Sequence, residues 1–372
     1  MFRRLNDALI QYRAARTSGD KRGLLIISSG GIGDSILFSL MIERFMALVG
    51  EDDPVTLVVR TESLGVGFLF PSRVNIIGVD YRRFIRDGTY KRQVCADLRA
   101  LNVQIAISSD HLRLPTVDDV MVMATGAAQK FALRPRTWPK HDRALAQHEA
   151  WYTRWIEPDP APAHRLIRWW ELANALTGES PPPPKVAFAA DRLPVPAQAA
   201  RPYIVLHPFS AMAEREAAPD VFIAIADAYA KTHDIVVTAG PRDLARAPRH
   251  QPLADMPGVS VDTSSFKEKA ALLRGAALVV SVDTSIMHLA VGVGAPTLCL
   301  ASAAHIVDSV PYDSRMMPEN AHFMVPEVDC AGCLGQCIHP LESGRYKCLG
   351  QITAAASVAR CQSLLAAHAA GA

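Results

Sequence analysis

The chain has 372 residues, a formal net charge of +2 and 49% hydrophobic residues. That length favours two domains, because a single hydrophobic core rarely grows beyond about 250–300 residues. A charge so close to neutrality argues against a nucleic-acid-binding protein. No apolar run approaches the roughly 18 residues of a membrane-spanning helix and no signal-peptide pattern is present, so we expect a cytoplasmic protein.

Residues 1–20 are predicted to form a basic amphipathic helix. Phe2, Leu5, Leu9 and Tyr12 recur at roughly helical spacing beside several arginines. Such a helix can contact the anionic cytoplasmic face of an inner membrane, or it can pack on its own domain. Both interpretations stay open on the sequence alone.

Apolar runs typical of buried strands alternate with helical patterns through the first half of the chain. These runs cover 24–29, 55–60, 74–80 and 103–109, and a helical pattern covers 34–49. Strands that alternate with helices favour βαβ units, whose parallel sheet is covered on both faces. We therefore predict a doubly wound α/β domain over residues 1–180.

A proline-rich stretch at 181–202 is predicted to connect two domains. It begins with four consecutive prolines, which cannot lie inside a helix or a central strand and which form a stiff connector. Strand patterns then return at 203–210, 234–240, 277–283 and 296–302, with helical patterns from about 220 and near 267–274 and 285–293. We predict a second doubly wound domain over 203–350 and a C-terminal helix over 351–372.

Ligands of open α/β sheets bind beyond the carboxyl ends of the strands, so we expect the site in a central cleft between the domains. A glycine-rich turn, GGIGDS at 30–35, follows the first predicted strand. Such a turn often holds a phosphate, but the carboxylate of Asp34 would repel one there.

A better phosphate site is predicted at 281–296, SVDTSIMHLAVGVGAP. Asp283 ends a predicted strand, Thr284 and Ser285 open the next helix, and His288 lies one turn further on. The free N–H groups of a helix N-terminus and the two hydroxyls can bind a pyrophosphate. An ordinary capped helix is the alternative that this pattern leaves open.

Three segments in this order resemble the ADP-heptose:lipopolysaccharide heptosyltransferases of glycosyltransferase family 9. They are GGIGDSILFSLMIERF, HPFSAMAEREAAPDVF and DTSIMHLAVGVGAPTLCL, and the resemblance covers roughly 24–365. It implies the GT-B fold, in which two Rossmann-like domains face a central cleft. It also implies an inverting, metal-independent transfer of heptose from ADP-heptose to a lipopolysaccharide-core, lipid-linked or other glycan acceptor.

The resemblance implies that Asp34 is the general base that takes the proton of the acceptor hydroxyl, with Gly33 beside it on the acceptor side. This role explains a carboxylate where a phosphate cradle would exclude one. A helix N-terminus favours the ionised carboxylate and so weakens the base, which can still act if the proton is lost late. A plain helix-capping aspartate is the alternative. Asp110, His111 and Arg113, after the fourth predicted strand, are further acceptor-side candidates or an exposed loop without a role.

Donor binding falls to the second domain in this family. Arg215 stands where the family's K-x-W-P has its lysine, and a guanidinium can still clamp a diphosphate. Ala217 and Ala218 replace the tryptophan and the proline, and Ser285 replaces a glycine. The resemblance adds these donor-side positions to Asp283, Thr284, Ser285 and His288: Ser210 as a phosphate-side hydroxyl, and Gly240 with Asp243 as the turn that meets the nucleotide ribose.

Four of the seven cysteines lie within 330–348: Cys330, Cys333, Cys337 and Cys348. A C-x-x-C pair with two further thiols is compatible with a structural zinc or iron ion. Small buried thiols that pack as weak hydrophobes are the alternative. The family's catalysis requires no cofactor, so we expect any such metal to be structural.

Other functions stay open on the sequence. They are a protein O-heptosyltransferase with a structural metal finger, a sugar-nucleotide epimerase that acts on the donor alone, and a scaffold protein that keeps the fold without catalysis. The departures at Arg215 and Ser285 leave room for the last of these. No residue that we can place distinguishes ADP from UDP or GDP.

Overall fold

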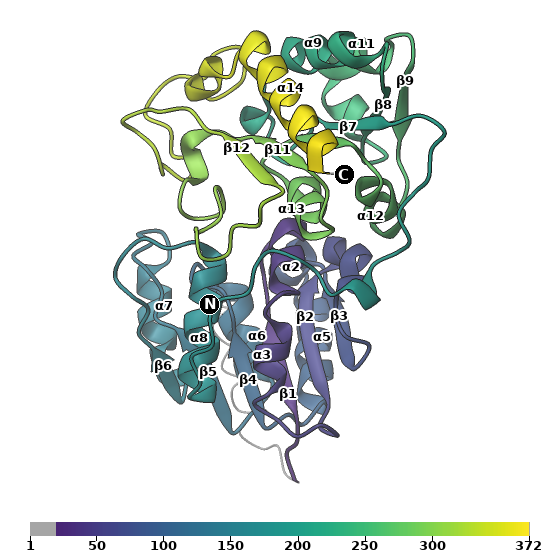
Figure 1. Cartoon of the computed structure of the whole chain (residues 1–372). Helices are drawn as coiled ribbons and strands as arrows, with labels where there is room; N and C mark the ends of the chain where they lie inside the picture. Colours follow the sequence, from purple (N-terminus) through teal and green to yellow (C-terminus); the bar gives the residue numbers. More distant parts are fainter. Residues whose placement is uncertain (1–19, 372) are drawn as a thin grey trace. The chain divides into compact units, whose positions relative to one another are not determined.

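The computed structural model describes residues 20–371, and the chain divides into two compact units (Figure 1). Unit 1 runs to Ala161 and again over Arg165–Pro183, and unit 2 comprises Pro162–His164 and the chain from Pro184 onwards. Each unit has its own parallel sheet with flanking helices, which confirms the predicted pair of doubly wound α/β folds. The basic segment predicted at 1–20 lies outside the described residues except for its last residue.

The sheet of unit 1 has six parallel strands in the order β3-β2-β1-β4-β5-β6. They are β1 (Leu24–Ile27), β2 (Val55–Arg60), β3 (Val74–Val79), β4 (Ile105–Ser108), β5 (Gln129–Leu133) and β6 (Arg154–Ile156). β1 is buried along its whole length, because a central parallel strand is covered on both faces. Leu24 pairs with Val55 of β2 on one side and with Ile105 of β4 on the other, so the strand order reverses between β1 and β4.

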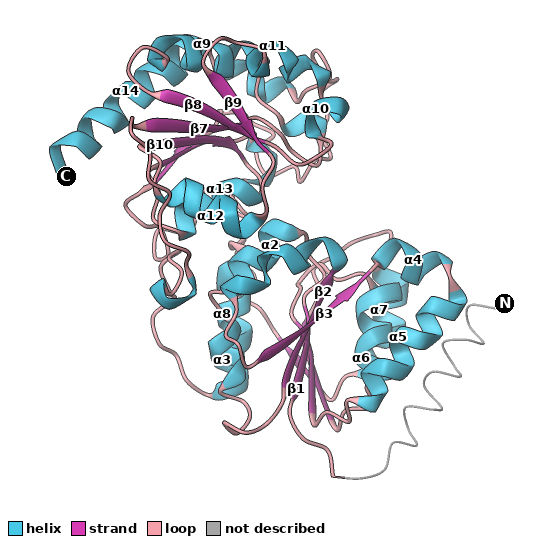
Figure 2. Cartoon of the chain, turned by 90° about the vertical axis from the view of Figure 1, so that its right-hand side faces the viewer, coloured by secondary structure: helices cyan, strands magenta, loops and turns pink. Residues whose placement is uncertain are grey.

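Helices cover both faces of this sheet. They are α2 (Ile32–Phe38), α3 (Ile42–Met46), α4 (Tyr81–Arg86), α5 (Gly88–Ala100), α6 (Val120–Ala124), α7 (Asp142–His148) and α8 (Arg165–Thr177). Figure 2 shows α2, α3 and α8 on one face and α4, α5, α6 and α7 on the other. The edge of the Phe38 ring meets Trp169 at a centroid distance of 5.1 Å, and this buried pair joins α2 to α8.

The helix predicted over 34–49 is wrong as a single element, because the structure divides it into α2 and α3. Ser39 ends α2, and its Oγ donates a hydrogen bond to the carbonyl of Ile36 at 2.7 Å. Serine hydroxyls that bond back to the preceding turn weaken and bend helices. The apolar periodicity continues across this break, so the sequence pattern alone gave one helix.

The sheet of unit 2 also has six parallel strands, in the order β12-β11-β10-β7-β8-β9. They are β7 (Tyr203–His207), β8 (Asp234–Thr238), β9 (Val259–Asp262), β10 (Leu278–Val282), β11 (Thr297–Leu300) and β12 (Ala321–Met324). Leu278 of β10 pairs with Ile204 of β7, and the strand order reverses between these two strands.

The helices of unit 2 again lie on both faces of the sheet. They are α9 (Pro219–Tyr229), α10 (Asp243–Arg246), α11 (Gln251–Ala254), α12 (Phe266–Arg274), α13 (Ser285–Gly292) and α14 (Ala354–Gly371). Figure 2 shows α12 and α13 on one side of the strands and α9 and α11 on the other. Pro219 opens α9 at a position where a missing N–H costs nothing, and Ser265 and Glu268 cap α12 reciprocally.

Most of the proline-rich stretch belongs to unit 2. The N–H of Val186 donates to the carbonyl of Met316 at 3.0 Å, and that of Phe188 donates to Gly292 at 2.8 Å. A Cβ at Gly292 would lie 2.0 Å from the Phe188 ring, so α13 packs tightly against this segment. The stretch 184–202 is therefore attached along the surface of unit 2 for part of its length.

Candidate functional site

The predicted motifs follow the strands at which each sheet reverses its order. In unit 1, β1 leads into the turn that carries Asp34, and β4 leads into Asp110. In unit 2, β7 leads into the loop that carries Arg215, and β10 leads into Asp283. Such switch points are where open α/β sheets bind their ligands, so each unit has one candidate site.

The turn after β1 folds around the carboxylate of Asp34. The Oδ2 atom of Asp34 accepts a hydrogen bond from the N–H of Gly31 at 2.6 Å, and Gly33 and Asp34 are half-buried in the first turn of α2. Gly30 makes this arrangement sterically feasible, because a Cβ there would lie 2.3 Å from the Cβ of Asp34. The carboxylate is thus held by a backbone N–H of its own turn.

Arg165 binds the other oxygen of the same carboxylate. Its Nη1 contacts Oδ1 of Asp34, and the two side chains are 26% and 21% exposed, so a ligand in solution can reach the pair. The guanidinium and the N-terminus of α2 both favour the ionised carboxylate. Sequence analysis missed Arg165, because it lies 131 residues from Asp34 and nothing in its local sequence connects the two.

Asp110 is tied to the end of β1. Its Oδ2 accepts hydrogen bonds from the N–H and the Oγ of Ser29, at 2.7 and 2.8 Å, and burial raises the pKa of this carboxyl. The neighbouring His111 is half-buried, and its pKa falls to about 4 through burial and the nearby guanidinium groups. His111 is therefore a neutral imidazole near pH 7.

Arg113, the third predicted acceptor-side residue, lies in the core of unit 1. Its side chain is fully buried, with Nε 2.6 Å from Oδ1 of Asp119 and Nη1 3.0 Å from the carbonyl of Leu133. The guanidinium also lies over the ring of Trp155, 4.5 Å from its centroid. In this conformation an acceptor in solution does not reach the Arg113 side chain.

In unit 2, Arg215 and Asp283 join the two strands at the switch point. Nη2 of Arg215 pairs with the Asp283 carboxylate and lies 3.2 Å from the Asp283 carbonyl oxygen. Asp283 is almost fully buried, and the Nε of Arg215 has no hydrogen-bond partner among residues 20–371. The pair fixes the guanidinium beside the N-terminus of α13.

Glu216 holds the loop in which Arg215 lies. One carboxylate oxygen accepts the N–H of Ser210 at 2.9 Å, and the other contacts Arg249 and lies 3.0 Å from Nε2 of His250. Burial alone would raise the pKa of Glu216, but the hydrogen bonds from His250, Ser210 and Arg249 hold it below its ordinary value. Sequence analysis missed this cluster, because Arg249 and His250 lie more than 30 residues from Glu216 along the chain.

The N-terminus of α13 is not capped by its own side chain. Thr284 is the N-cap residue with an extended backbone, and its hydroxyl makes no capping hydrogen bond. Thr284 and Ser285 are half-buried, whereas His288 is buried with its Nδ1 2.7 Å from the hydroxyl of Tyr312. The first turn of α13 therefore offers backbone N–H groups and two hydroxyls at the switch point.

Gly240 and Asp243 repeat the geometry of the turn in unit 1. Oδ2 of Asp243 accepts the N–H of Gly240 at 2.6 Å, and a Cβ at Gly240 would lie 3.0 Å from that oxygen. Arg246 lies 3.7 Å from the Asp243 carboxylate and donates to the carbonyl of Ser210 at 3.4 Å. The predicted donor-side residues thus form a connected set within unit 2, apart from His288, whose ring contacts Tyr312.

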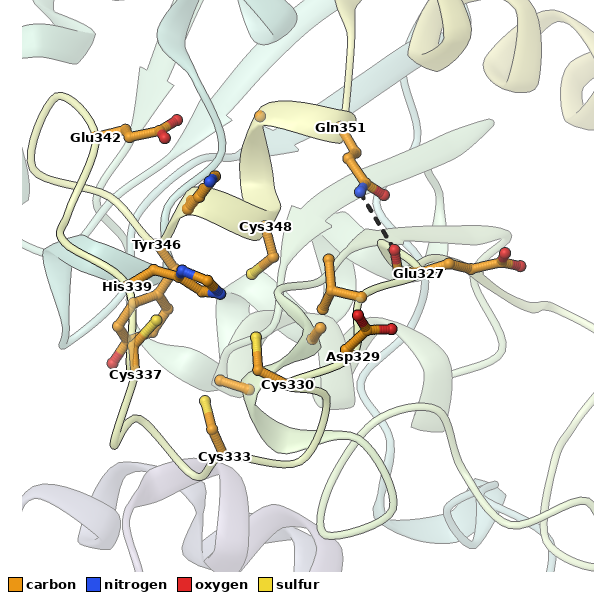
Figure 3. A pocket seen from close by; sticks show the side chains of 15 residues that line it. Glu327, Asp329, Cys330, Cys333, Cys337, His339, Glu342, Tyr346, Cys348 and Gln351 are labelled. Carbon is orange, nitrogen blue, oxygen red and sulfur yellow. Dashed lines mark hydrogen bonds between the residues drawn. The ribbon is translucent and has the colours of Figure 1, made fainter.

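The four clustered cysteines line one pocket of about 540 Å³ in unit 2. Figure 3 shows Cys330, Cys333, Cys337 and Cys348 around this space with the ring of His339 among them. Burial raises the pKa of the Cys348 thiol, and the three other thiols add to this effect. Within residues 20–371, however, no three His, Cys, Asp or Glu side chains converge closely enough to hold a metal ion. As placed, these side chains share a pocket without forming a coordination site.

Comparison with known proteins agrees with this architecture. The family model for glycosyltransferase family 9 (heptosyltransferase) matches residues 129–321. No curated protein matches the chain. A glycosyltransferase family 9 structure from Veillonella parvula is similar at 15% identity, with 94% of this chain and 98% of that chain covered and a TM-score of 0.68.

Two further solved structures share the fold. The E. coli heptosyltransferase WaaC with ADP-2-deoxy-2-fluoro heptose is 19% identical, with 92% of this chain and 99% of that chain covered and a TM-score of 0.64. The iron-containing dodecameric glycosyltransferase TibC from enterotoxigenic E. coli is 14% identical, with 93% and 76% covered and a TM-score of 0.50. Because the family model covers more than half of the chain, this GT-B protein belongs to glycosyltransferase family 9, the heptosyltransferases, and is a glycosyltransferase.

Proposed function

We propose that this glycosyltransferase moves a heptose from ADP-heptose to a hydroxyl of a lipopolysaccharide-core or other glycan acceptor, with inversion and without a metal ion in catalysis. The observation that carries the proposal is the carboxylate of Asp34, held by Gly31 on one oxygen and by Arg165 on the other. It is paired with a guanidinium, partly exposed and fixed at the switch point of unit 1. A positioned carboxylate of this kind can act as a general base.

Acceptor activation is assigned to Asp34. As the acceptor oxygen bonds to the anomeric carbon, its proton passes to the carboxylate and the bond to the diphosphate breaks. This single displacement inverts the anomeric centre and needs one base. Gly31 and Arg165 fix the direction of the carboxylate, and Gly33 lets an acceptor approach the turn without a side chain in the way.

Stabilisation of the leaving ADP is assigned to unit 2. Negative charge accumulates on the diphosphate in the transition state, and donors already aimed at it contribute most to the rate. The N–H groups of α13, the hydroxyls of Thr284 and Ser285, and the guanidinium of Arg215 supply these donors. Asp283 orients that guanidinium. Ser210, Gly240, Asp243 and His288 complete the proposed donor side, the Gly240 turn facing the ribose.

The proposed setting is cytoplasmic, at the inner face of a membrane. Within residues 20–371 no helix combines the length and the apolar character needed to cross a bilayer. The basic segment at 1–20 would supply the contact with anionic lipid. Asp110 and His111 stay as proposed acceptor-side residues. Arg113 is not proposed to contact the acceptor, because its side chain is fully buried in the core of unit 1.

The test is a titration of the purified protein with ADP, UDP, GDP and CDP in the presence of EDTA, followed by calorimetry and thermal unfolding. A ligand that binds only the folded state adds about 2.7 kcal/mol of stability at 100 times its Kd. We expect ADP to bind preferentially. A preference for another nucleotide would refute the assigned donor, and no response to any of the four would favour the catalytically altered scaffold.

A protein acceptor with a structural metal finger is the second candidate, favoured by the four thiols that line one pocket. Zinc or iron would need Cys330, Cys333, Cys337 and Cys348 to turn toward one point, because they do not converge as placed. Metal analysis of the protein as purified tests this directly, with Cys333→Ser as the variant and Cys299→Ser, a buried thiol outside the pocket, as the matched control. One ion per chain that only the Cys333 variant loses would support it.

A further inference from the structure

Two carboxyl groups share one serine hydroxyl beneath the turn that holds Asp34. Ser29 follows the end of β1, and its Oγ lies 2.8 Å from Oδ2 of Asp110 and 3.0 Å from Oδ2 of Asp118. A hydroxyl carries a single proton and can donate to only one of these oxygens. The other contact is a hydrogen bond only if a carboxyl carries the second proton.

The surroundings identify the protonated carboxyl as that of Asp118. Asp118 lies in η2 (Pro115–Asp119) and is fully buried, its Oδ2 accepts the N–H of Leu114 at 2.5 Å, and its Oδ1 has no partner among the described residues. An ionised carboxylate with one oxygen unpartnered in the core is costly. Asp110 is less costly to ionise, because it is half-buried and the N–H groups of Ser29 and Gly30 both favour its ionised form.

Other charged groups around the pair favour the same assignment. Arg60, at the end of β2, donates through Nε to the carbonyl of Ser29 at 2.6 Å and favours the ionised form of Asp110. Asp119 beside Asp118 is paired with a buried arginine. Burial raises the pKa of Asp118 well above its ordinary value, and the charges of Asp110 and Asp119 raise it further.

Two phenols also interact with Asp118. Tyr152 donates to Asp119 at 2.7 Å, and burial raises its pKa well above the ordinary value. The second phenol is that of Tyr81 in α4. Its oxygen is buried without a hydrogen-bond partner among the described residues. Burial raises its pKa well above the ordinary value, and Asp118 and Asp110 add to that shift, so Tyr81 stays neutral. It supplies no positive charge that would stabilise a second carboxylate.

We propose that Asp118 is a positioning residue, held as a neutral carboxylic acid that donates to Ser29, which in turn donates to an ionised Asp110. The chain of donors runs from Oδ2 of Asp118 to Oγ of Ser29 and from Oγ of Ser29 to Oδ2 of Asp110. It anchors the residue from which the Gly30–Asp34 turn departs. The link to turnover rests on the proposed function of Asp34, whereas the location of the proton does not.

The proposal has a consequence for the dependence on pH. Ionisation of Asp118 would place two carboxylates against one hydroxyl, so alkaline pH releases the anchor and lowers turnover. Because the folded state holds this proton more tightly than the unfolded state, the stability contributed by Asp118 falls as pH rises above its unfolded pKa. An asparagine at 118 can donate to Ser29 without titrating, so it should remove both effects, but its amide nitrogen cannot also accept the N–H of Leu114, and that hydrogen bond is lost.

Three variants test the proposal: Asp118→Asn, Asp118→Ala and Ser29→Ala. We expect Asp118→Asn to lose some turnover with the Leu114 hydrogen bond, but to hold its rate at alkaline pH where the parent protein declines. Asp118→Ala and Ser29→Ala each remove two hydrogen bonds and should each lose about 10–100-fold. A rate of Asp118→Asn that declines at the same alkaline pH as that of the parent would overturn the proposal, because another group would then carry the titration.

Infrared spectroscopy near pH 7 tests the proton without any substrate. The parent protein should show a carbonyl stretch of a protonated carboxyl that is absent from Asp118→Asn, and Asp110→Asn should shift its titration to lower pH by removing the like charge. Identical spectra of the parent and Asp118→Asn would refute the assignment. A confirmed band in a protein without glycosyl transfer would refute the proposed function and leave the proton assignment intact.

Discussion

Replacement of Gly30 by alanine is expected to break the turn that holds Asp34. A Cβ at position 30 would lie 2.3 Å from the Cβ of Asp34 and 2.4 Å from its Oδ2, closer than such atoms approach in real structures. The Cβ of Asp34 is fixed to the backbone of α2 and cannot rotate away. The turn itself must therefore shift, and the hydrogen bond from Gly31 to Asp34 is lost with it.

The expected loss of stability can be worked out from these contacts. Overpacking costs about 1–3 kcal/mol and the lost capping hydrogen bond about 1 kcal/mol. An alanine also restricts the unfolded chain, which offsets about 0.4–1 kcal/mol. The net loss is about 1–3.6 kcal/mol. For a unit of this size each kcal/mol corresponds to about 2–4 °C, so the Tm of unit 1 should fall by about 2–14 °C.

Gly31→Ala is the matched control, one residue along the chain. A Cβ there would have its nearest neighbour, Oδ2 of Asp34, at 3.7 Å, and the backbone φ of −76° suits alanine. Calorimetry should show a Tm that is unchanged or slightly raised for Gly31→Ala and clearly lowered for Gly30→Ala, which should also lose turnover. Equal melting temperatures for the two variants would refute the steric argument.

Three further predictions concern charge. Asp34→Asn keeps an oxygen for the N–H of Gly31 but cannot take a proton, so turnover should fall by about 10²–10⁴-fold. Calorimetry should show an unchanged affinity for ADP. Weaker ADP binding would instead assign Asp34 to the donor side. Arg215→Ala removes a charge-assisted hydrogen bond and should weaken ADP binding by about 10–100-fold, with Arg215→Lys in between; parent-like affinity would exclude Arg215 from the donor site. Burial lowers the pKa of His207 to about 4. The neutral imidazole therefore contributes about 3 kcal/mol to the free energy of unfolding. This contribution is complete above the unfolded pKa of about 6.5 and is lost as pH falls toward 4. His207→Asn should flatten this decline in urea unfolding series; an unchanged pH dependence would show that another group carries it.

The central strands could be predicted from the sequence because they are buried on both faces. β1, β7 and β10 are buried along their whole length and appear as unbroken apolar runs. β6 has three residues and is partly exposed, and β9 has no fully buried residue. Edge strands of this kind bury too little surface to leave a strong apolar pattern, so the sequence analysis passed over them.

Residues of the candidate site could be predicted from the sequence only where they belong to a short, continuous motif. Asp283 directly follows β10 and Asp34 lies in the first turn of the helix after β1, so the turn or helix start beside each could be recognised. Arg165, which binds the Asp34 carboxylate, and Asp118, which shares the Ser29 hydroxyl, reach their partners through the fold. Their positions depend on which strands pair and how helices return to the sheet, and single-sequence patterns do not encode that.

The proposed catalytic and donor-binding charges are each balanced within their own unit. Asp34 is paired with Arg165, and Arg215 is paired with Asp283, of which Asp283 is almost completely buried. Such a pair presents little net charge to an approaching diphosphate, so long-range attraction contributes little to donor binding. Recognition must then depend on short, directed contacts from the N–H groups of α13 and from the guanidinium edge that Asp283 leaves unoccupied. For the same reason, the direction of the Arg215 side chain matters as much as its charge, and Asp283 sets that direction.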